Sequence, residues 1–182
     1  GYLLDAILLA LPSARGMRSR YLYAKQAISR FLAERGTSDV RLLTVPAGYA
    51  REFFEVAEKN PSPRLEWRGI DLDAELIVNL NKKSPRNFQF AQGDAFATES
   101  YSEQHDFIMS IGFTEFLDDA KTLEFFALIH DNLTHGGRFY TTAMLPHRIS
   151  EYLLRNIAEI HTSYRDEQHL RGLVSQAGFK HI

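Results

Sequence analysis

Three small or acidic residues recur along the chain at equal spacing, and together they could hold a nucleoside. Gly48 follows an apolar, β-branched run, Asp71 lies 23 residues further on, and Asp94 lies another 23 residues beyond it. A glycine between a strand and a helix lets a ligand approach the backbone, because it has no side chain in the way. A carboxylate at the end of the next strand can accept hydrogen bonds from both hydroxyls of an adenosine ribose. The spacing therefore predicts a site for an adenosine-containing ligand.

The third of these residues extends the interpretation to the base. Asp94 can accept a hydrogen bond from an adenine amino group, while Ala95 and Phe96 pack against the ring. Each segment also has a purely structural explanation, since many strand–helix turns contain one glycine and a Gly-Asp pair favours a turn. Asp73 could likewise cap the helix that follows it. Both roles can hold together, with Asp71 for the ligand and Asp73 for the cap.

The segments around these residues alternate between strand and helix, which is typical of βαβ units and a parallel sheet. Apolar, β-branched runs predict strands, and amphipathic stretches predict helices. Strands are expected at 40–45, 65–72, 87–91, 106–111 and 138–144, and helices at 2–11, 18–34, 49–59, 74–82, 119–133, 147–161 and 166–176. Right-handed crossovers bring the loops that follow the strands to one edge of the sheet, where such sheets bind ligands.

The composition fits a single α/β domain. With 182 residues, the chain can bury a core without a disulfide or a metal. Its formal net charge of −2 argues against a protein that binds nucleic acid or an anionic membrane through charge. The absence of cysteine excludes disulfides, cysteine-ligated zinc and thiol catalysis, and it fits a reducing, cytoplasmic location. His130 and His135 do not share a helical face, so we expect no metal site.

The beginning of the chain is apolar from Tyr2 to Leu11. This stretch is too short to cross a bilayer, which takes about 20 residues, and it has no basic leader typical of a signal peptide. It could instead pack against a second copy of the chain, as in a homodimer, or against a flanking domain. Gly1 in place of an initiator Met fits a piece excised or tagged from something longer.

These motifs, taken in order, resemble the class I S-adenosylmethionine-dependent methyltransferases. The resemblance covers about residues 38–182, which would form the cofactor-binding core behind N-terminal helices at 1–37. The segments that carry it are the Gly48 turn, Gly69 to Asp71, Gly93 to Ala95 and Phe107 to Gly112. Within the family, Ser110 to Asp119 and Gly136 to Thr141 resemble a little-characterised methyltransferase group.

The resemblance implies a Rossmann-like, mostly parallel sheet with helices on both faces that binds S-adenosylmethionine. The residues that it implies as cofactor contacts, joined by Phe96 from the packing argument above, are Thr44, Pro46, Ala47, Gly48, Tyr49, Asp71, Leu72, Asp94, Ala95, Ser110, Ile111 and Gly112. The acceptor of the methyl group is expected to be a small molecule.

The chain departs from the family in two places. The first family motif has an acid followed by three alternating glycines, and here those positions are Thr44, Pro46, Gly48 and Ala50. The missing acid removes a partner for the amino-acid part of the cofactor. The family sheet also ends with two more strands and a hairpin, whereas this chain ends at 179–182. We therefore expect the last strands to be absent, through either truncation or loss.

Methyl transfer from a sulfonium depends mainly on in-line geometry, so no catalytic triad is expected. Glu115 could orient or deprotonate a substrate amine, and His147 could take a proton from a hydroxyl or amine acceptor. Their ordinary alternatives are a solvated loop acid and a histidine that begins a surface helix. Arg15, Arg18 and Arg20 could receive an anionic substrate, or they could form a solvated surface.

Two other functions remain open. A nicotinamide-dependent oxidoreductase needs backbone amide donors for a pyrophosphate, yet Pro46 has no amide hydrogen and Tyr49 and Ala50 crowd the same turn. Because S-adenosylmethionine carries no phosphate, it tolerates this loop better. The altered first motif also fits a methyltransferase-fold domain with a non-catalytic binding or structural role.

Overall fold

A five-stranded sheet forms the centre of this computed structural model, which describes residues 12–145 and 162–181. The strands are β1 (Val40–Thr44), β2 (Leu65–Asp71), β3 (Phe88–Gln92), β4 (His105–Ser110) and β5 (Leu133–Thr141). Their spatial order is β3-β2-β1-β4-β5, and every neighbouring pair is parallel. The predicted α/β class with a parallel sheet is confirmed.

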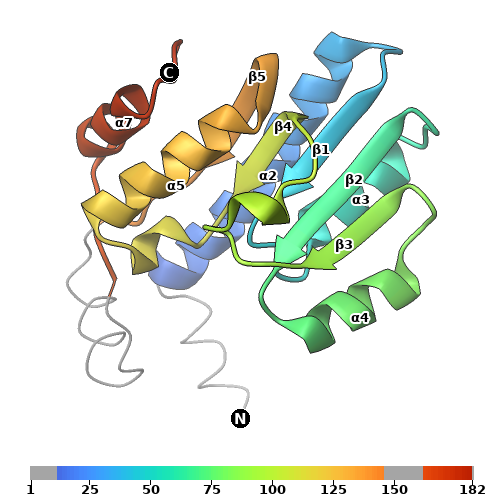
Figure 1. Ribbon diagram of the computed structural model, residues 1–182, viewed down its shortest axis with the longest axis horizontal. Helices are drawn as coiled ribbons and strands as arrows, with labels where there is room; N and C mark the ends of the chain where they lie inside the picture. Colours follow the sequence, from blue (N-terminus) through green and yellow to red (C-terminus); the bar gives the residue numbers. More distant parts are fainter. Residues whose placement is uncertain (1–11, 146–161, 182) are drawn as a thin grey trace.

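Helices cover both faces of the sheet (Figure 1). They are α2 (Pro12–Arg35), α3 (Arg51–Lys59), α4 (Ala74–Lys83), α5 (Asp119–Asp131) and α7 (Glu167–Gln176), with short 3₁₀ turns η1 (Thr98–Ser100) and η2 (Thr114–Phe116). Successive side chains of a strand point to opposite faces, so Leu42 packs with α2, α3 and α4 while Leu43 packs with α5 and α7. Two hydrophobic cores result, one on each side.

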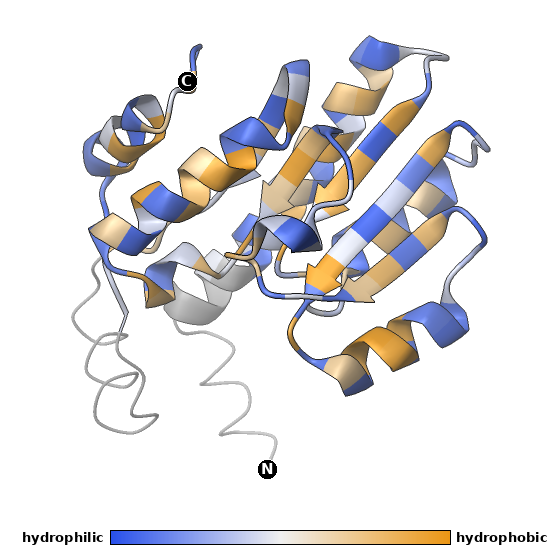
Figure 2. Cartoon of the chain, in the orientation of Figure 1, coloured by the Kyte–Doolittle hydropathy of each residue, from blue (hydrophilic) through white to orange (hydrophobic). Residues whose placement is uncertain are grey.

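β3 lies at one edge of the sheet, with β2 beside it. Along β2 and β3, buried residues alternate with polar or exposed ones, a pattern visible on β2 in Figure 2. Phe88 and Phe90 of β3 point into the core shared with α2, α3 and α4. This alternation is the period-2 signal of a half-buried strand.

Most expected boundaries agree with the structure to within two residues, but both ends of the strand expected at 138–144 and the start of the helix expected at 18–34 were wrong. The helix expected at 119–133 ends at Asp131, and the strand expected from residue 138 begins at Leu133. Gly137 lies inside β5, where an added Cβ would come within 2.9 Å of the carbonyl oxygen of Thr134. The register of β4 against β5 is irregular at this point, between His105 and Phe107.

The two ends of the described chain differ from the expectations in length and in extent. The second predicted helix is longer than expected, because α2 extends back to Pro12. The helices predicted at 2–11 and 147–161 lie outside the described residues. Within the described ranges no strand follows β5, and no helix there is long and apolar enough to cross a membrane.

Candidate functional site

Asp71 ties the loop after β1 to the end of β2. Its Oδ2 accepts a hydrogen bond from the backbone N–H of Gly48 at 2.8 Å, and its Oδ1 accepts one from the N–H of Asp73 at 3.1 Å. The N–H of Ala47 donates to the carbonyl of Ile70 at 2.7 Å, which fixes the same loop from its other side. The structure thus brings together the glycine and the first acid that the sequence singled out.

Asp73 plays the capping role that the sequence offered for it. It is the N-cap of α4, and its Oδ1 accepts a hydrogen bond from the N–H of Leu76 at 3.0 Å. An N-cap carboxylate satisfies one of the free amide groups of the first helical turn. The cap is confirmed, and it leaves Asp71 as the acid at the end of β2.

Asp94 lies beside Asp71, because β2 and β3 are neighbouring parallel strands. The N–H of Gly93 donates to the backbone carbonyl of Asp71 at 2.9 Å. Asp94 is exposed, and its Oδ1 accepts the N–H of Phe96 at 2.9 Å, so it also forms the turn that a Gly-Asp pair favours. The two aspartates therefore follow adjacent strands at one edge of the sheet.

Phe96 packs differently from the prediction that places it against a base. Its ring lies 6.0 Å from that of Phe113 and 5.9 Å from that of Phe125, centroid to centroid. The ammonium of Lys121 lies 5.1 Å from its centroid. Phe96 thus belongs to the core shared with α5, and its contact with an adenine ring stays a prediction.

The remaining predicted cofactor contacts differ in exposure. Tyr49 and Leu72, which flank Gly48 and Asp71 in sequence, are large side chains that are 77% and 66% exposed. Both side chains are therefore accessible to a ligand that binds near Asp71. The buried members of the set are Thr44, Ala47, Ala95 and Ser110, and the half-buried ones are Pro46, Gly48, Asp71, Phe96, Ile111 and Gly112.

Glu115 is not the solvated loop acid that the sequence left open as an alternative. It lies in η2, just after β4, with only 2% of its surface exposed. Its Oε1 is 2.6 Å from Nη1 of Arg20, which comes from α2. Its Oε2 is buried and has no hydrogen-bond partner among the described residues. The other predicted catalytic residue, His147, lies outside the described residues.

Sequence reasoning missed the pairing of Arg20 with Glu115, although it noted the run of arginines near Arg20. The two residues are 95 positions apart. A Cβ added to Gly112 would lie 3.0 Å from Nη1 of Arg20, so the guanidinium lies directly over the loop that follows β4. The buried hydroxyl of Ser110, at the end of the same strand, has no hydrogen-bond partner in the described part of the chain.

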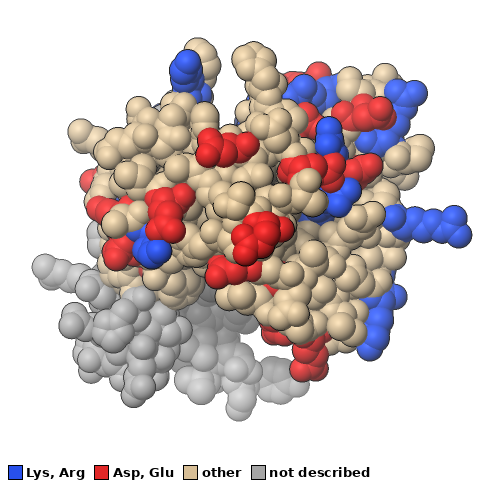
Figure 3. Space-filling model, viewed as in Figure 1, with Lys and Arg blue, Asp and Glu red and all other residues tan. Residues whose placement is uncertain are grey.

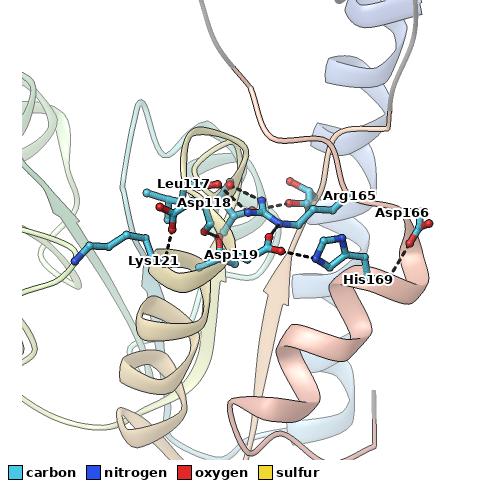
Figure 4. Close-up of polar contacts among 10 residues, drawn as sticks. Leu117, Asp118, Asp119, Lys121, Arg165, Asp166 and His169 are labelled. Carbon is cyan, nitrogen blue, oxygen red and sulfur yellow. Dashed lines mark hydrogen bonds and ion pairs between the residues drawn. The ribbon is translucent and has the colours of Figure 1, made fainter.

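A second arginine, Arg165, holds the loop that carries Glu115 (Figure 4). It is 2% exposed, and its guanidinium donates to the carbonyls of Thr114 and Leu117, each at 2.7 Å. Its Nε donates to Asp119 at 2.9 Å, and Nε2 of His169 lies 2.7 Å from the other oxygen of that carboxylate. Sequence reasoning missed Arg165 because no motif surrounds it.

The Arg165 contacts also change the acidity of Asp119. Partial burial acts to raise the pKa of this carboxyl group, but the hydrogen bonds from Arg165 and His169 outweigh it and hold the pKa below its ordinary value. Asp119 is therefore a stable anion in neutral solution, and the Arg165 guanidinium links it to the η2 turn.

Acidic and basic side chains are distributed unevenly over the described surface in Figure 3. On the face seen in Figure 3, acidic side chains are spread over the middle of the described surface, and basic ones lie mainly toward its upper and right-hand margins. That face therefore carries no continuous basic patch in its described part. Within residues 12–145 and 162–181, no three His, Asp or Glu side chains gather as a metal ion would require.

Several solved structures share this architecture, although their sequences are distant. A protein of Bordetella parapertussis, described as a possible exported protein, is similar with a TM-score of 0.83 and 19% identity, over 94% of this chain. LepI in complex with SAM is similar with a TM-score of 0.66 and 12% identity, over 82% of this chain. The S-adenosylmethionine-dependent methyltransferase SibL is similar with a TM-score of 0.65 and 19% identity, over 94% of this chain.

The match covers only part of each of these proteins. The chain spans 64% of the length of the Bordetella protein, 40% of LepI and 54% of SibL. At the level of sequence, no family model and no curated protein matches the chain. The strand order, the parallel pairing and the structural similarities show that the chain has the fold of the class I S-adenosylmethionine-dependent methyltransferases.

Proposed function

We propose that the chain is an S-adenosylmethionine-dependent methyltransferase that acts on a small-molecule acceptor. The observation that carries the proposal is the contact of Asp71 with the backbone of Gly48, at the edge of the sheet where Asp94 follows the adjacent strand. Ligands of open parallel sheets bind at this edge. The fold supports the same site, and the side chains of Tyr49 and Leu72 are exposed there.

Each predicted contact has a distinct role in this proposal. Asp71 accepts hydrogen bonds from the ribose hydroxyls, and Asp94 accepts one from the adenine amino group, with Ala95 beneath the base. Gly48 lets the ligand approach the loop backbone, and its neighbours on either side complete the wall. The contacts that follow β4 face the other half of the cofactor. The full set is Thr44, Pro46, Ala47, Gly48, Tyr49, Asp71, Leu72, Asp94, Ala95, Phe96, Ser110, Ile111 and Gly112.

The chain's own contribution to the reaction is to bind, align and exclude water. Bound S-adenosylmethionine supplies an activated methyl group on a sulfonium. Holding a nucleophile in line with that methyl group can contribute most of the rate enhancement, so few acid–base groups are needed. Glu115 and His147 are the proposed residues for orienting the acceptor or removing its proton.

The proposal extends to the surroundings of the protein. A cytoplasmic location fits the absence of cysteine, and the near-neutral charge fits a small-molecule substrate better than nucleic acid or a membrane surface. The apolar stretch at 2–11 would pack against a second copy of the chain or a flanking domain.

Replacing Asp71 by alanine tests the proposed cofactor site. We expect Asp71→Ala to weaken the binding of S-adenosylhomocysteine by about 1.5–3 kcal/mol, the scale of hydrogen bonds to a charged group. Isothermal titration measures this directly. Asp73→Ala is the matched control: it removes an acid two residues away and a helix cap, and it should leave the affinity unchanged. An unchanged affinity in Asp71→Ala would refute the assignment.

Alanine substitutions at two glycines distinguish the effect of a blocked ligand site from the effect of backbone strain. Gly48 and Gly36 both have positive φ, 49° and 63°, and an added Cβ would meet no atom within 4 Å at either. Alanine at either position should cost about 1 kcal/mol of stability from strain in the left-handed region. Only Gly48→Ala should weaken binding of S-adenosylhomocysteine, because its methyl group would occupy the ligand's space. Equal effects of both variants on affinity would contradict this.

A non-catalytic binding or structural role is the second candidate. One observation favours it: Ala50, where the family motif has its third glycine, has a strained φ of 48°. Titration decides between the candidates. No binding of either S-adenosylmethionine or S-adenosylhomocysteine at millimolar concentration would favour the non-catalytic role.

A further inference from the structure

The ion pair of Arg20 and Glu115 has hydrogen-bonding capacity that the described protein does not use. Glu115 is 2% exposed, and only its Oε1 is bonded, at 2.6 Å from Arg20. A guanidinium has five N–H donors, and among the described residues that of Arg20 donates to Glu115 alone. Its side chain keeps 19% of its surface exposed. Within the described part of the chain, one buried acceptor and several donors are therefore without a partner, and a ligand could use them.

Such an arrangement is costly unless something else binds to it. Taking charges out of water carries a desolvation penalty that one contact between them rarely offsets. Buried polar atoms are nearly always hydrogen-bonded, so a bare carboxylate oxygen calls for an explanation. A bound ligand that completes the hydrogen bonds of Glu115 would supply one.

The position of the pair identifies which part of a ligand it would meet. A Cβ on Gly112 would lie 3.0 Å from Arg20 Nη1 and 3.9 Å from Glu115 Oε1, so both charges lie over the loop after β4. β4 lies next to β1, on the opposite side from β2 and its Asp71. A ligand whose adenosine half is bound at β2 and β3 would extend its other half toward this pair.

We propose that Arg20 and Glu115 bind the amino-acid half of S-adenosylmethionine. This rests on the proposed function. Glu115 Oε2 accepts hydrogen bonds from the α-ammonium group, and the remaining N–H groups of Arg20 donate to the α-carboxylate. In this assignment Glu115 binds the cofactor, and proton removal from the acceptor is left to His147. The positive and negative groups of the amino-acid half thus meet Glu115 and Arg20 respectively, and the charges of the ion pair sum to zero. The first family motif has an acid at the end of β1, where this chain has Thr44. Glu115 would take over the role of that acid from a different loop.

Two ligands that differ only in the amino-acid half test the assignment. S-adenosylhomocysteine carries both charged groups, and 5′-methylthioadenosine carries neither. The double variant Arg20→Met with Glu115→Gln should bind S-adenosylhomocysteine about 10- to 100-fold more weakly than the wild type, the loss expected for charged hydrogen bonds. Its affinity for methylthioadenosine should not change. Isothermal titration of both ligands gives the ratio.

The double variant is used because a single substitution would leave a buried charge unpaired and could unfold the protein. Unchanged binding of methylthioadenosine also reports that the adenosine half of the site is intact. The matched control is Lys25→Met with Glu55→Gln, which removes another ion pair of α2, 2.8 Å long and directed to α3. It should leave the affinity for both ligands unaltered.

The outcomes separate this inference from the proposed function. If the wild type binds neither ligand, the proposed function fails and the inference with it. If the wild type binds both but the double variant weakens both equally, or weakens neither, the adenosine site stands and the inference is overturned. Selective loss of S-adenosylhomocysteine binding supports it.

Discussion

Arg165→Met is expected to lower the free energy of unfolding by about 3–6 kcal/mol, because two hydrogen bonds from a charged, buried donor are worth about 1.5–3 kcal/mol each. The guanidinium is 2% exposed and bonds the carbonyls of Thr114 and Leu117. Methionine fills a similar volume but leaves both carbonyls without that donor. Urea denaturation followed by circular dichroism measures the difference.

Arg64→Met is the matched control for this prediction. Arg64 also donates to a backbone carbonyl, that of Thr37 at 2.8 Å, but it does so on the surface. Exposed substitutions usually change stability by less than about 0.5 kcal/mol. Arg165→Lys should lie between the two, since an ammonium cannot reproduce the planar fork. If Arg165→Met lowered the free energy of unfolding no more than Arg64→Met does, the hydrogen bonds of Arg165 to the carbonyls of Thr114 and Leu117 would not stabilise the fold.

The second large effect expected is that His105 lowers the free energy of unfolding in mild acid. His105 begins β4 and is 1% exposed, and neither ring nitrogen has a hydrogen-bond partner among the described residues. The pKa of His105 is lowered from 6.5 to about 4, mainly by burial; the charges of Arg68 and Arg41 act in the same direction, and those of Glu103 and Asp106 oppose it. The folded protein therefore keeps this imidazole neutral where the unfolded chain protonates it.

The sign of the pH dependence follows from that difference. As the pH falls below 6.5, the unfolded state binds a proton that folded His105 does not, so the free energy of unfolding decreases until about pH 4. The total loss is about 3 kcal/mol. Paired carboxylates act at lower pH: Glu55, with its pKa lowered from 4.5 to about 2, loses its stabilising effect only in stronger acid. Between pH 6.5 and pH 4.5, the change in the free energy of unfolding therefore reports on His105.

His105→Phe should remove most of this pH dependence. A phenyl ring has similar shape and nothing to protonate, and it replaces nitrogens that gain no hydrogen bond from the described residues. Stability at pH 7 should accordingly be unchanged or higher. Replacing the exposed His135 by phenylalanine is the control and should leave the acid sensitivity of the wild type. If His105→Phe kept the same slope of unfolding free energy against pH, His105 would not be its source.

Both predictions bear on the candidate site through β4. His105 is at the start of this strand, and the η2 turn held by Arg165 follows its end. Glu115 lies in that turn, and its backbone carbonyl accepts a hydrogen bond from the N–H of Ser163 at 2.6 Å. The conformation after β4 therefore depends on α2 through Arg20 and on the segment before α7 through Ser163 and Arg165.

The sequence by itself determined the parallel α/β architecture and the meeting of Gly48, Asp71 and Asp94 at one edge. β-branched runs and helical periods are local signals, and parallel strands joined by right-handed crossovers bring their ends together whatever the details of packing. The Asp73 cap was equally readable, because a cap depends on residues within one helical turn.

Only the tertiary structure decided the contacts of Arg20, Glu115 and Arg165. Arg20 and Glu115 are 95 residues apart, and Arg165 reaches carbonyls 51 and 48 residues away. Such pairings depend on how α2 and the segment before α7 dock against the loop after β4, and no local period encodes that docking. The start of β5 was predicted at residue 138 instead of Leu133 for a related reason, because it depends on pairing with the neighbouring strand β4 and no local signal shows that pairing.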